Sequence, residues 1–314
     1  MRRILITGGA GNVGGSLARR LVEDPNNFVL ILDNLLTGSI TKLPDSKYKN
    51  WQFINADVNN LKEILQIFKH ESLDYVFHYA AVVGVKRTLA DPIAVLKDVD
   101  GVKNILQISN DLQVKRIFLS SSSEVYGEPV EIPQNEITTP LNAKLPYAIV
   151  KNISESYCRS FYQMFGLKYT IFRFFNTYGP LQSDDFVLTK FIKNASLDLD
   201  LEIYGDGSQT RTFCFIEDNL KATIACMEED FCVNDVVNIG NDNEISILKL
   251  AEIVIEVLKS KSNIKFVKPL AEGDMTRRNP DITKMKMIMK DQLISLKEGI
   301  MLTQEGLISN KFNL

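Results

Sequence analysis

A tyrosine and a lysine four residues apart form the pair in this sequence that is best suited to acid–base chemistry. They are Tyr147 and Lys151, and residues with this spacing share one face of a helix, so the lysine ammonium can lie beside the phenol. A phenol has a pKa of about 10 and is a poor base at neutral pH, but a neighbouring positive charge favours the phenolate. The pair therefore predicts a tyrosine that exchanges a proton with a substrate.

A run of polar residues precedes this pair and gives it context, because the spacing alone arises about once by chance in such a composition. The apolar segment Arg116–Ser120 leads into consecutive serines and then Glu124. In open α/β sheets, ligands bind outside the carboxyl ends of the strands, so a serine placed there faces a binding crevice. The alternative is that the serines only serve the chemistry of a turn.

A cluster of glycines near the N-terminus has the spacing of a phosphate-binding loop. Gly8, Gly11 and Gly14 follow an apolar segment and open a helical one. Glycines at these points permit a tight turn and a close approach of a pyrophosphate to the backbone. The free N–H groups and the positive dipole end of the helix then face the phosphates. An ordinary strand-to-helix turn is the alternative.

An acidic residue at the end of the second apolar segment adds to this interpretation. Asp33 lies nineteen residues after Gly14. A carboxylate there accepts hydrogen bonds from the ribose hydroxyls of a dinucleotide and repels a 2′-phosphate, which favours NAD over NADP. Asp57 and Val58, after the third apolar segment, suit the edge of the adenine, although Asp57 is equally well explained as a surface acid at a strand end.

Short apolar runs alternate with helical periodicity in the first half of the chain. This rhythm predicts an α/β fold, a Rossmann-type doubly wound parallel sheet with right-handed crossovers. The expected strands are Ile4–Thr7, Phe28–Leu32, Phe53–Asn55, Tyr75–His78, Arg116–Ser120 and Lys168–Phe174. The expected helices are Val13–Val22, Leu61–Phe68, Val99–Ile108 and Tyr147–Phe165.

After residue 175 the segments become shorter and richer in turns. Residues 1–175 are therefore predicted to form the dinucleotide-binding domain, and residues 176–314 a smaller mixed α/β domain that binds the substrate. Part of 212–240 is a candidate for a return of the chain to the first domain. The helices expected here are Ile247–Ser260 and Ile282–Met289.

Length and composition narrow the class of protein. The chain has 314 residues, of which 45% are hydrophobic and 24% charged, and this fits one large or two modest globular domains. A net charge of −3 argues against a nucleic-acid binder or a binder of anionic membranes. Four cysteines without CxxC spacing and two histidines predict no metal site, no disulfides and a cytoplasmic location. The sequence shows neither a signal-peptide pattern nor an apolar run long enough to span a membrane.

Further motifs follow in order along nearly the whole chain. They are Thr7–Gly14, Asp33-Asn34-Leu35 with Thr37-Gly38, Asp57-Val58, His78-Tyr79-Ala80-Ala81, Ser122 with Tyr126-Gly127, Pro146-Tyr147 with Lys151, Arg173–Asn176 with Tyr178-Gly179-Pro180, and Tyr204–Gly207 with Arg211. Together they resemble the extended short-chain dehydrogenase/reductases that act on nucleotide-diphosphate sugars. The motifs are far more specific for this family than for the reaction of one member.

The resemblance implies NAD as the cofactor and a nucleotide-diphosphate sugar as the substrate, bound by the domain at 176–314. The residues that it assigns to the cofactor are Gly8, Gly11, Asn12, Val13, Gly14, Asp33, Asn34, Asp57, Val58, Ala80, Ala81, Tyr147 and Lys151. Asn12 stands where the family usually has an aromatic residue.

The same resemblance assigns catalytic and substrate-binding roles. Tyr147 takes the proton from a sugar hydroxyl, usually at C4, Lys151 binds the nicotinamide ribose and tunes Tyr147, and Ser122 hydrogen-bonds the same hydroxyl. Asn176 and Arg211 hold the nucleotide diphosphate, to which a guanidinium is well matched.

Departures from the family pattern concern the substrate more than the cofactor. Thr212 replaces the usual aspartate after Arg211, and Asp98 replaces a structural asparagine. The arginine that usually precedes a Gly-Asp pair is missing before Gly273-Asp274, and Arg277 or Arg278 is the candidate replacement. The segment that begins at Arg278 resembles one in the decarboxylases of the family.

The reaction after the shared oxidation at C4 depends on Glu124. In family dehydratases, a glutamate two residues after the catalytic Ser or Thr removes the C5 proton, and Ser122-Ser123-Glu124 matches this run. A carboxylate in a polar turn is the alternative. A nucleotide-sugar 4-epimerase is the leading expectation, while a 4,6-dehydratase, a decarboxylase or a 4-dehydrogenase that releases the 4-keto sugar remain open. From another class, a non-catalytic dinucleotide-sensing module would not need Ser122, Tyr147 and Lys151.

Two of the expected helices also bear on assembly. Val99–Ile108 and Tyr147–Phe165 resemble the helices that pair as a four-helix bundle in family homodimers. A homodimer is therefore expected, unless the apolar faces of both helices are buried entirely against the sheet.

Overall fold

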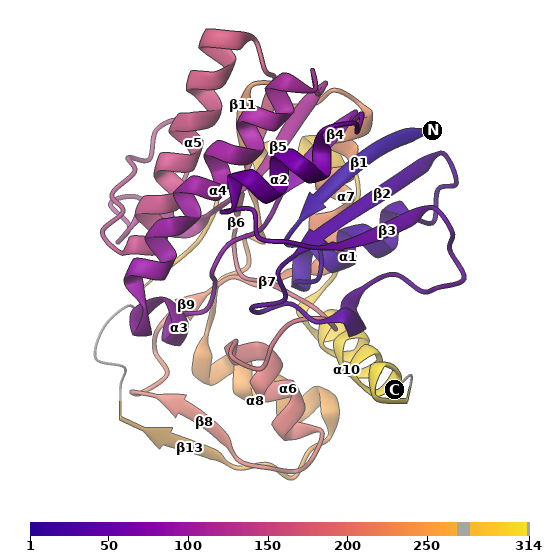
Figure 1. The fold of residues 1–314 in the computed structure, drawn as a ribbon. Coiled ribbons are helices and arrows are strands. Elements are labelled where there is room, and N and C mark those ends of the chain that lie inside the picture. Colours follow the sequence, from indigo (N-terminus) through magenta and orange to yellow (C-terminus); the bar gives the residue numbers. More distant parts are fainter. Residues whose placement is uncertain (269–276, 313–314) are drawn as a thin grey trace. The chain divides into compact units, whose positions relative to one another are not determined.

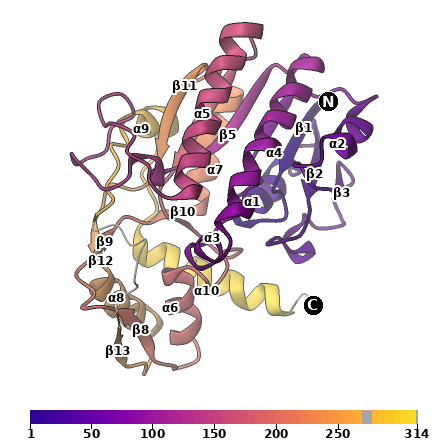
Figure 2. The same ribbon diagram turned by 60° about the vertical axis from the view of Figure 1, so that its left-hand side comes forward.

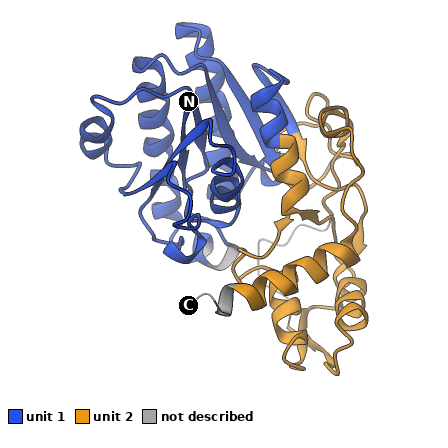
Figure 3. Ribbon diagram, turned by 90° about the vertical axis from the view of Figure 1, so that its right-hand side faces the viewer, with its two compact units in different colours: residues 1–125, 143–173, 223–237 blue, residues 126–142, 174–222, 238–314 orange. Residues whose placement is uncertain are grey.

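The computed structural model describes residues 1–268 and 277–312 and divides the chain into two compact units. The first unit contains residues 1–125, 143–173 and 223–237 (Figure 3). The second unit contains residues 126–142, 174–222 and 238–314. Each unit therefore consists of segments that are separated along the chain.

The described part of the first unit is built on a seven-stranded sheet with the order β11-β6-β5-β4-β1-β2-β3 (Figure 1). The strands are β1 (Arg2–Thr7), β2 (Asn27–Asp33), β3 (Trp51–Asn55), β4 (Tyr75–His78), β5 (Arg116–Ser122), β6 (Tyr169–Phe174) and β11 (Asp235–Ile239). From β3 through β2, β1 and β4 to β5, neighbouring strands pair in parallel. The order reverses between β1 and β4, which is where doubly wound sheets bind their ligands. The predicted fold class is confirmed.

Helices cover both faces of this sheet (Figures 1 and 2). The helices that begin in this unit are α1 (Asn12–Leu21), α2 (Leu61–Phe68), α3 (Val85–Ala90), α4 (Pro92–Asp111) and α5 (Pro146–Phe165), with two short 3-10 helices, η1 (Ile40–Lys42) and η2 (Ser123–Tyr126). The helices α2, α4 and α5 bury one face of the strands in a core to which each contributes, through Phe68, Ile105 and Cys158. The helix α1 packs on β1 and β2 from the other face (Figure 1).

Local sequence signals set the ends of the two longest helices of this unit. The helix α5 begins at Pro146, whose fixed φ and missing N–H suit a first turn, and ends before Gly166, which has a φ of 77°. The helix α4 begins at Pro92, and the carboxylate of Asp91 accepts a hydrogen bond from the N–H of Ala94 at 2.9 Å.

The second unit combines short two-stranded sheets with helices. Its strand pairs are β7 (Thr177–Tyr178) with β10 (Cys214–Phe215), β8 (Leu201–Tyr204) with β13 (Ile264–Val267), and β9 (Thr210–Arg211) with β12 (Ile245–Ser246). The remaining helices are α6 (Val187–Ala195), α7 (Ile216–Glu228), α8 (Ile247–Leu258), α9 (Thr283–Met289) and α10 (Leu296–Phe312), of which α7 continues into the first unit. Across the described ranges, no helix is both long enough and apolar enough to cross a bilayer.

A single boundary at residue 175 does not describe this division. Residues 126–142 belong to the second unit, because the backbone N–H of Gln134 donates to Asn279 O at 2.8 Å and the Tyr126 hydroxyl donates to Asn238 Oδ1 at 2.8 Å. Residues 223–237 belong to the first unit, because β11 takes the edge of the sheet beside β6. The chain thus leaves and re-enters each unit.

Of the helices in the described residues, the sequence pattern misses four, α3, α6, α7 and α10, and it places the start of α4 seven residues too late, at Val99 instead of Pro92. The first turns of α4 carry the exposed residues Ile93 and Leu96, which disturb the periodicity of a buried face. The helix α7 follows β10 directly, without a breaking residue between them.

His78 ends β4 as a buried, neutral imidazole. Its Nδ1 lies 2.7 Å from the Thr7 hydroxyl at the end of β1, and its side chain is 2% exposed. Burial, assisted by the nearby charge of Lys151, lowers the pKa of His78 to about 3. An unfolded chain takes up this proton near pH 6.5, so folding excludes a proton throughout the range between these two values.

This exclusion predicts an acid-sensitive contribution to stability. Between pH 7 and pH 4.5, the unfolded state gains a proton at His78 that the folded state does not, which costs the folded state about 2–3 kcal/mol. Replacing His78 with Asn removes this term. We expect urea unfolding at the two pH values to show a shallower pH dependence for His78→Asn than for the unchanged protein. The exposed His70, as His70→Asn, is the matched control, and equal slopes for all three proteins would contradict the assignment.

Candidate active site

The glycine loop joins β1 to α1 and lies against the end of β4. Gly8 has a φ of 68°, and a Cβ atom there would lie 2.6 Å from the backbone nitrogen of Ala80. A Cβ on Gly14 would collide with the carbonyl oxygen of Gly8, and one on Gly11 would lie 3.0 Å from the same oxygen. Glycine at these three positions therefore lets the loop pack closely on its own backbone and on the end of β4.

The start of α1 is equipped for a negatively charged group. Gly11 is the N-cap and supplies no side-chain acceptor to the first-turn N–H groups, which include those of Asn12 and Val13. The Asn12 side chain is also there, and its Oδ1, a hydrogen-bond acceptor, is buried without a partner. The first-turn N–H groups at an uncapped helix N-terminus, reached through a loop of glycines, fit the pyrophosphate of a dinucleotide.

Asp33 is held at the end of β2 by two backbone groups. Its Oδ2 accepts a hydrogen bond from the N–H of Ala10 at 2.9 Å, and its Oδ1 accepts one from Leu35 at 2.8 Å. Each carboxylate oxygen can accept further bonds, so the fixed carboxylate remains suited to a ribose diol. Asn34 is exposed beside it and accepts a hydrogen bond from the N–H of Leu36 at 3.0 Å.

The other residues assigned to the cofactor lie at the ends of the neighbouring strands. Val58 is buried after β3, and its carbonyl accepts a hydrogen bond from the side chain of Asn104 at 2.8 Å. Asp57 binds the N–H of Asn59 at 2.9 Å. Ala80 follows β4, donates to the Thr7 hydroxyl at 3.3 Å and is followed by the half-buried Ala81. The structure thus brings β1, β2, β3 and β4 together at one edge, as the parallel pairing requires.

Tyr147 and Lys151 occupy one face of α5, in its first and second turns. The Lys151 ammonium lies 5.8 Å from the centre of the Tyr147 ring and donates to Ser120 O at 2.7 Å and to Ser120 Oγ at 3.2 Å. Burial lowers the pKa of Lys151 to about 8, against the opposing charge of Asp98. The lysine is therefore still protonated at pH 7, in a dry site where its charge acts strongly on the phenol.

Asp98 lies on α4 and holds the segment that follows β4. Its Oδ2 accepts a hydrogen bond from the N–H of Val82 at 2.7 Å, and burial raises the pKa of its carboxyl group. This carboxylate faces the charge of Lys151, so the departure from asparagine at this position adds a compensating charge to the site.

The end of β5 places the candidate hydroxyl and carboxylate. Ser122 is buried and its Oγ accepts a hydrogen bond from the N–H of Glu124 at 3.2 Å, so its own proton can be donated elsewhere. Glu124 is half-buried in η2, directly after the strand. With Tyr147 and Lys151 on α5, the same unit carries a phenol, a hydroxyl and an ammonium, the groups needed to move a proton to or from an alcohol.

The residues assigned to the substrate lie in the second unit. Asn176, which has a φ of 33°, donates from Nδ2 to Thr212 O at 2.9 Å. Arg211 on β9 is 8% exposed and donates to Thr210 O at 2.7 Å. Arg278 is also 8% exposed. The predicted gap before Gly273-Asp274 lies outside the described residues.

Glu244 joins the segments that carry these two arginines, and the sequence gives no signal for it. Its carboxylate receives Arg277 at 2.8 and 2.7 Å and also the hydroxyl of Thr210, the neighbour of Arg211. The Arg277 guanidinium lowers the pKa of Glu244 to about 2. Since Ile245 pairs with Arg211 between β12 and β9, the neighbourhoods of Arg211 and Arg278 meet at this one carboxylate.

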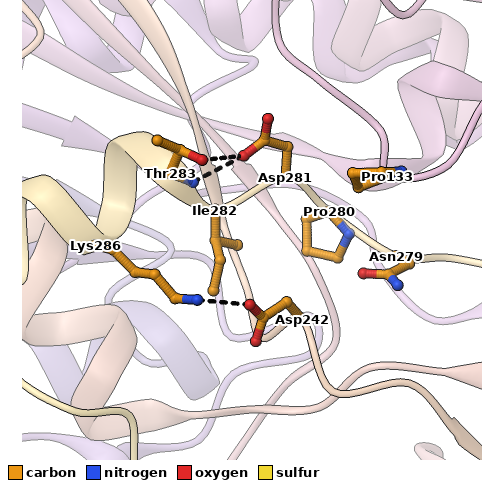
Figure 4. A pocket seen from close by; sticks show the side chains of 8 residues that line it. All are labelled: Pro133, Asp242, Asn279, Pro280, Asp281, Ile282, Thr283 and Lys286. Carbon is orange, nitrogen blue, oxygen red and sulfur yellow. Dashed lines mark hydrogen bonds and ion pairs between the residues drawn. The ribbon is translucent and has the colours of Figure 1, made fainter.

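A small pocket lies beside the same segment of the second unit (Figure 4). It has a volume of about 220 Å³, and its lining includes Asn279, next to Arg278, and the ion pair of Asp242 with Lys286 at 2.6 Å. The predicted site residues do not line it. Within the described residues, no cluster of three or more His, Cys, Asp or Glu side chains is arranged to hold a metal ion.

Comparison with known proteins identifies relatives along the whole chain. Residues 4–240 match the model of the NAD dependent epimerase/dehydratase family. A UDP-N-acetyl-alpha-D-glucosaminuronate decarboxylase of Bacillus cytotoxicus is 36% identical over 95% of this chain and 95% of its own. A putative UDP-glucose 4-epimerase of Methanocaldococcus jannaschii is 32% identical, with the same coverage of both chains. The solved UDP-glucose 4-epimerase of Thermotoga maritima, bound to UDP-glucose, superposes with a TM-score of 0.91 at 29% identity over 99% of each chain.

These matches confirm the family resemblance that the motifs predict, and with it the cofactor. The family match alone covers more than half of the chain, and the glycine loop, the uncapped start of α1 and Asp33 fit the cofactor that the family name states. The chain therefore belongs to the NAD-dependent epimerase/dehydratase family and is an NAD-dependent enzyme.

Proposed function

We propose that the enzyme oxidises C4 of a nucleotide-diphosphate sugar and, as its net reaction, epimerises the sugar at C4. The observation that carries this proposal is the Tyr147 phenol, which lies beside the buried ammonium of Lys151 in the unit that holds the glycine loop. Ser122, at the end of β5, supplies the hydroxyl that binds the reacting oxygen. A sensor of dinucleotides would have no use for this arrangement of acid–base groups.

The cofactor residues divide between the two ends of NAD. We assign the pyrophosphate to the glycine loop with Asn12 and Val13, the adenosine ribose to Asp33 with Asn34, and the adenine to Asp57 and Val58. Ala80 and Ala81 line the path toward Lys151, which binds the nicotinamide ribose. When bound, NAD⁺ supplies a hydride acceptor, and the residues of the chain hold NAD⁺ and the sugar in position.

Proton movement falls to Tyr147 and its neighbours. The Lys151 charge favours the phenolate of Tyr147, which takes the proton from the C4 hydroxyl, while Ser122 donates a hydrogen bond to the same oxygen. When the sugar ketone is reduced again, the phenol returns the proton. Epimerisation then requires that the ketone be presented by its opposite face, so the substrate domain must let the sugar turn.

The second unit holds the nucleotide diphosphate in this proposal. The guanidinium of Arg211 contacts the phosphates, and Asn176 binds beside it. Glu244 fixes the segment that carries Arg211 to the segment that carries Arg278. Such contacts remain in place while the sugar reacts.

Decarboxylation of a nucleotide-bound hexuronic acid is the second candidate. The buried guanidinium of Arg278 is suited to a carboxylate, and its segment resembles that of the decarboxylases. The relative at 36% identity is named as a decarboxylase of a UDP-linked uronic acid. A ketone at C4 makes loss of the C5 carboxyl group feasible, and we assign Glu124 the role of assisting at C5.

The role of Tyr147 is tested by Tyr147→Phe, which removes only the phenolic oxygen. Turnover should fall by roughly 10²- to 10⁴-fold, the usual contribution of general acid–base catalysis, whereas NAD⁺ affinity should stay within about threefold. Isothermal titration of NAD⁺ and a chromatographic assay of the sugar check the two expectations. Tyr162→Phe, on the exposed side of the same helix, is the control and should behave as the unchanged protein. Undiminished turnover by Tyr147→Phe would refute the assignment.

The net reaction is tested by mass spectrometry of UDP-, GDP-, CDP- and dTDP-sugars, uronic acids included, after incubation with the enzyme and NAD⁺. We expect a new chromatographic peak with unchanged mass, as an epimer gives. Loss of carbon dioxide would instead establish the decarboxylase. Loss of water would establish a dehydratase and give Glu124 the role of base, and loss of two hydrogens a dehydrogenase. No change with any sugar would favour the sensing module.

We also propose a homodimer formed through α4 and α5, and a cytoplasmic location. The two helices pack side by side (Figure 2). Apolar residues remain exposed on both, at Ile93 and Leu96 on α4 and at Ile149 and Ile153 on α5. Burying this double stripe against a second copy gives a four-helix bundle with twofold symmetry. The location rests on the four cysteines, which carry thiols and form no disulfide.

Ile153→Glu tests this interface, because a charge in the centre of an apolar bundle is costly. Light scattering during gel filtration should show a dimer for the unchanged protein and a monomer for the variant. Leu197→Glu, at an exposed apolar position of the second unit, should remain a dimer. A monomer for the unchanged protein, or a dimer for Ile153→Glu, would refute the proposed interface.

A further inference from the structure

Three consecutive serines at the end of β5 have three different partners. The carbonyl and hydroxyl of Ser120 accept hydrogen bonds from Lys151. The hydroxyl of Ser121 donates to Glu155 Oε1 at 2.7 Å. The hydroxyl of Ser122 accepts from the N–H of Glu124. The strand end that presents the reacting serine is thus tied to α5 at the two preceding residues.

Glu155 is a fully buried carboxylate with several donors around it. Arg173 on β6 binds it in a bidentate manner, with Nε 2.9 Å from Oε1 and a terminal nitrogen 2.8 Å from Oε2. Arg159, one turn further along α5, contacts Oε2 at 2.9 Å. Burial by itself would raise the pKa of Glu155, but the hydrogen bonds and charge of Arg173, aided by Ser121 and Arg159, hold it below its usual range. The group is therefore a fixed anion.

Glu155 shares a helix face with the catalytic pair. Tyr147, Lys151 and Glu155 follow one another at intervals of four residues on α5. Behind the phenol and the ammonium, the carboxylate therefore joins three elements, β5 through Ser121, β6 through Arg173, and α5 through its own backbone. The pair of Glu155 with Arg173 links α5 to β6, and the bond from Ser121 links α5 to the end of β5.

We propose that Glu155 is a positioning residue for the reaction, which acts through Ser121 to set the distance between the Ser122 hydroxyl and the Tyr147 phenol. The inference rests on the proposed function, because it presumes that these two groups act on one substrate oxygen. It assigns Glu155 no contact with substrate or cofactor. Its effect is geometric, and small displacements of reacting groups are costly to catalysis.

The variant that isolates this link is Ser121→Ala. It removes the hydroxyl that reaches Glu155 and leaves the ion pair with Arg173 in place, so the chain should fold, whereas Glu155→Gln would strand a buried guanidinium. We expect kcat to fall by roughly 10- to 100-fold, with KM and NAD⁺ affinity changed by less than about threefold. Ser121→Thr keeps a hydroxyl and should recover most of the lost rate.

Ser154→Ala is the matched control. Ser154 is a buried serine on the same helix, and its hydroxyl donates to Val150 O within that helix at 2.7 Å, without a bond to β5. Both alanine variants should lower the melting temperature by similar amounts, but only Ser121→Ala should lose kcat. Unchanged kcat in Ser121→Ala, equal losses in both variants, or no recovery by Ser121→Thr would each overturn the proposal.

A second readout needs no sugar. The ionisation of Tyr147 is followed at 295 nm as the difference between each protein and its Tyr147→Phe counterpart. Loosening the end of β5 weakens the contact of Lys151 with Ser120, so the midpoint of the Tyr147 titration should move to higher pH in Ser121→Ala and stay in place in Ser154→Ala. If no sugar is converted by the unchanged protein, the proposed function fails and this titration still decides on the coupling. If a sugar is converted and neither rate nor midpoint changes in Ser121→Ala, the inference alone fails.

Discussion

A positive charge buried behind the carboxyl edge of a parallel sheet is the constraint around which the first unit is organised. The Lys151 ammonium has left water, and its pKa of about 8 reflects the cost. The cost is limited by the backbone carbonyl and hydroxyl of Ser120, by the facing carboxylate of Asp98 and by a neutral His78 at the neighbouring strand end. An imidazolium in that place would add a second cation, which no carboxylate in the described part of the chain offsets. Burial has a free-energy cost because it removes the ammonium from water. It also strengthens the effect of this charge on a phenol, since little solvent screens it.

The two units handle charge in different ways. In the first, the ions next to the catalytic pair are buried and fixed, and Glu155 with Arg173 is nearly inaccessible to solvent. In the second, Arg277 is half exposed and Glu244 lies near the surface, so their pairing orders segments at little cost of desolvation. In the proposed function, the chemistry that depends on small distances is carried out on the sheet of the first unit, and the nucleotide diphosphate is bound by the second unit.

The sequence predicts those parts of the fold and of the site that depend on local patterns of residues. The glycine spacing, the acid at the end of β2 and the alternation of strands and helices identify the sheet and its cofactor edge, because each follows from the chemistry of a single turn or period. The start of α4 is not predicted correctly, because Ile93 and Leu96 are apolar and yet exposed. The roles of Glu155 and Glu244 are not predicted either, for another reason. Their partners Arg173 and Arg277 lie 18 and 33 residues away, and no periodicity connects such positions. The division of the chain also depends on a long-range pairing, that of β11 with β6.

The late arrival of β11 has a consequence for the growing chain. Residues 174–222 are made after β6 and before the segment that covers its edge, so a ribosome that has completed 1–222 carries the strands through β6 with one long side of β6 unpaired. Open strand edges invite pairing with other chains. Residues 174–222 are in this sense an insertion between two strands of the first unit, β6 and β11. The edge of β6 stays exposed until β11, which ends at residue 239, has been made and pairs with it. Truncated products that end within 174–234 should be the forms of this protein most prone to aggregate.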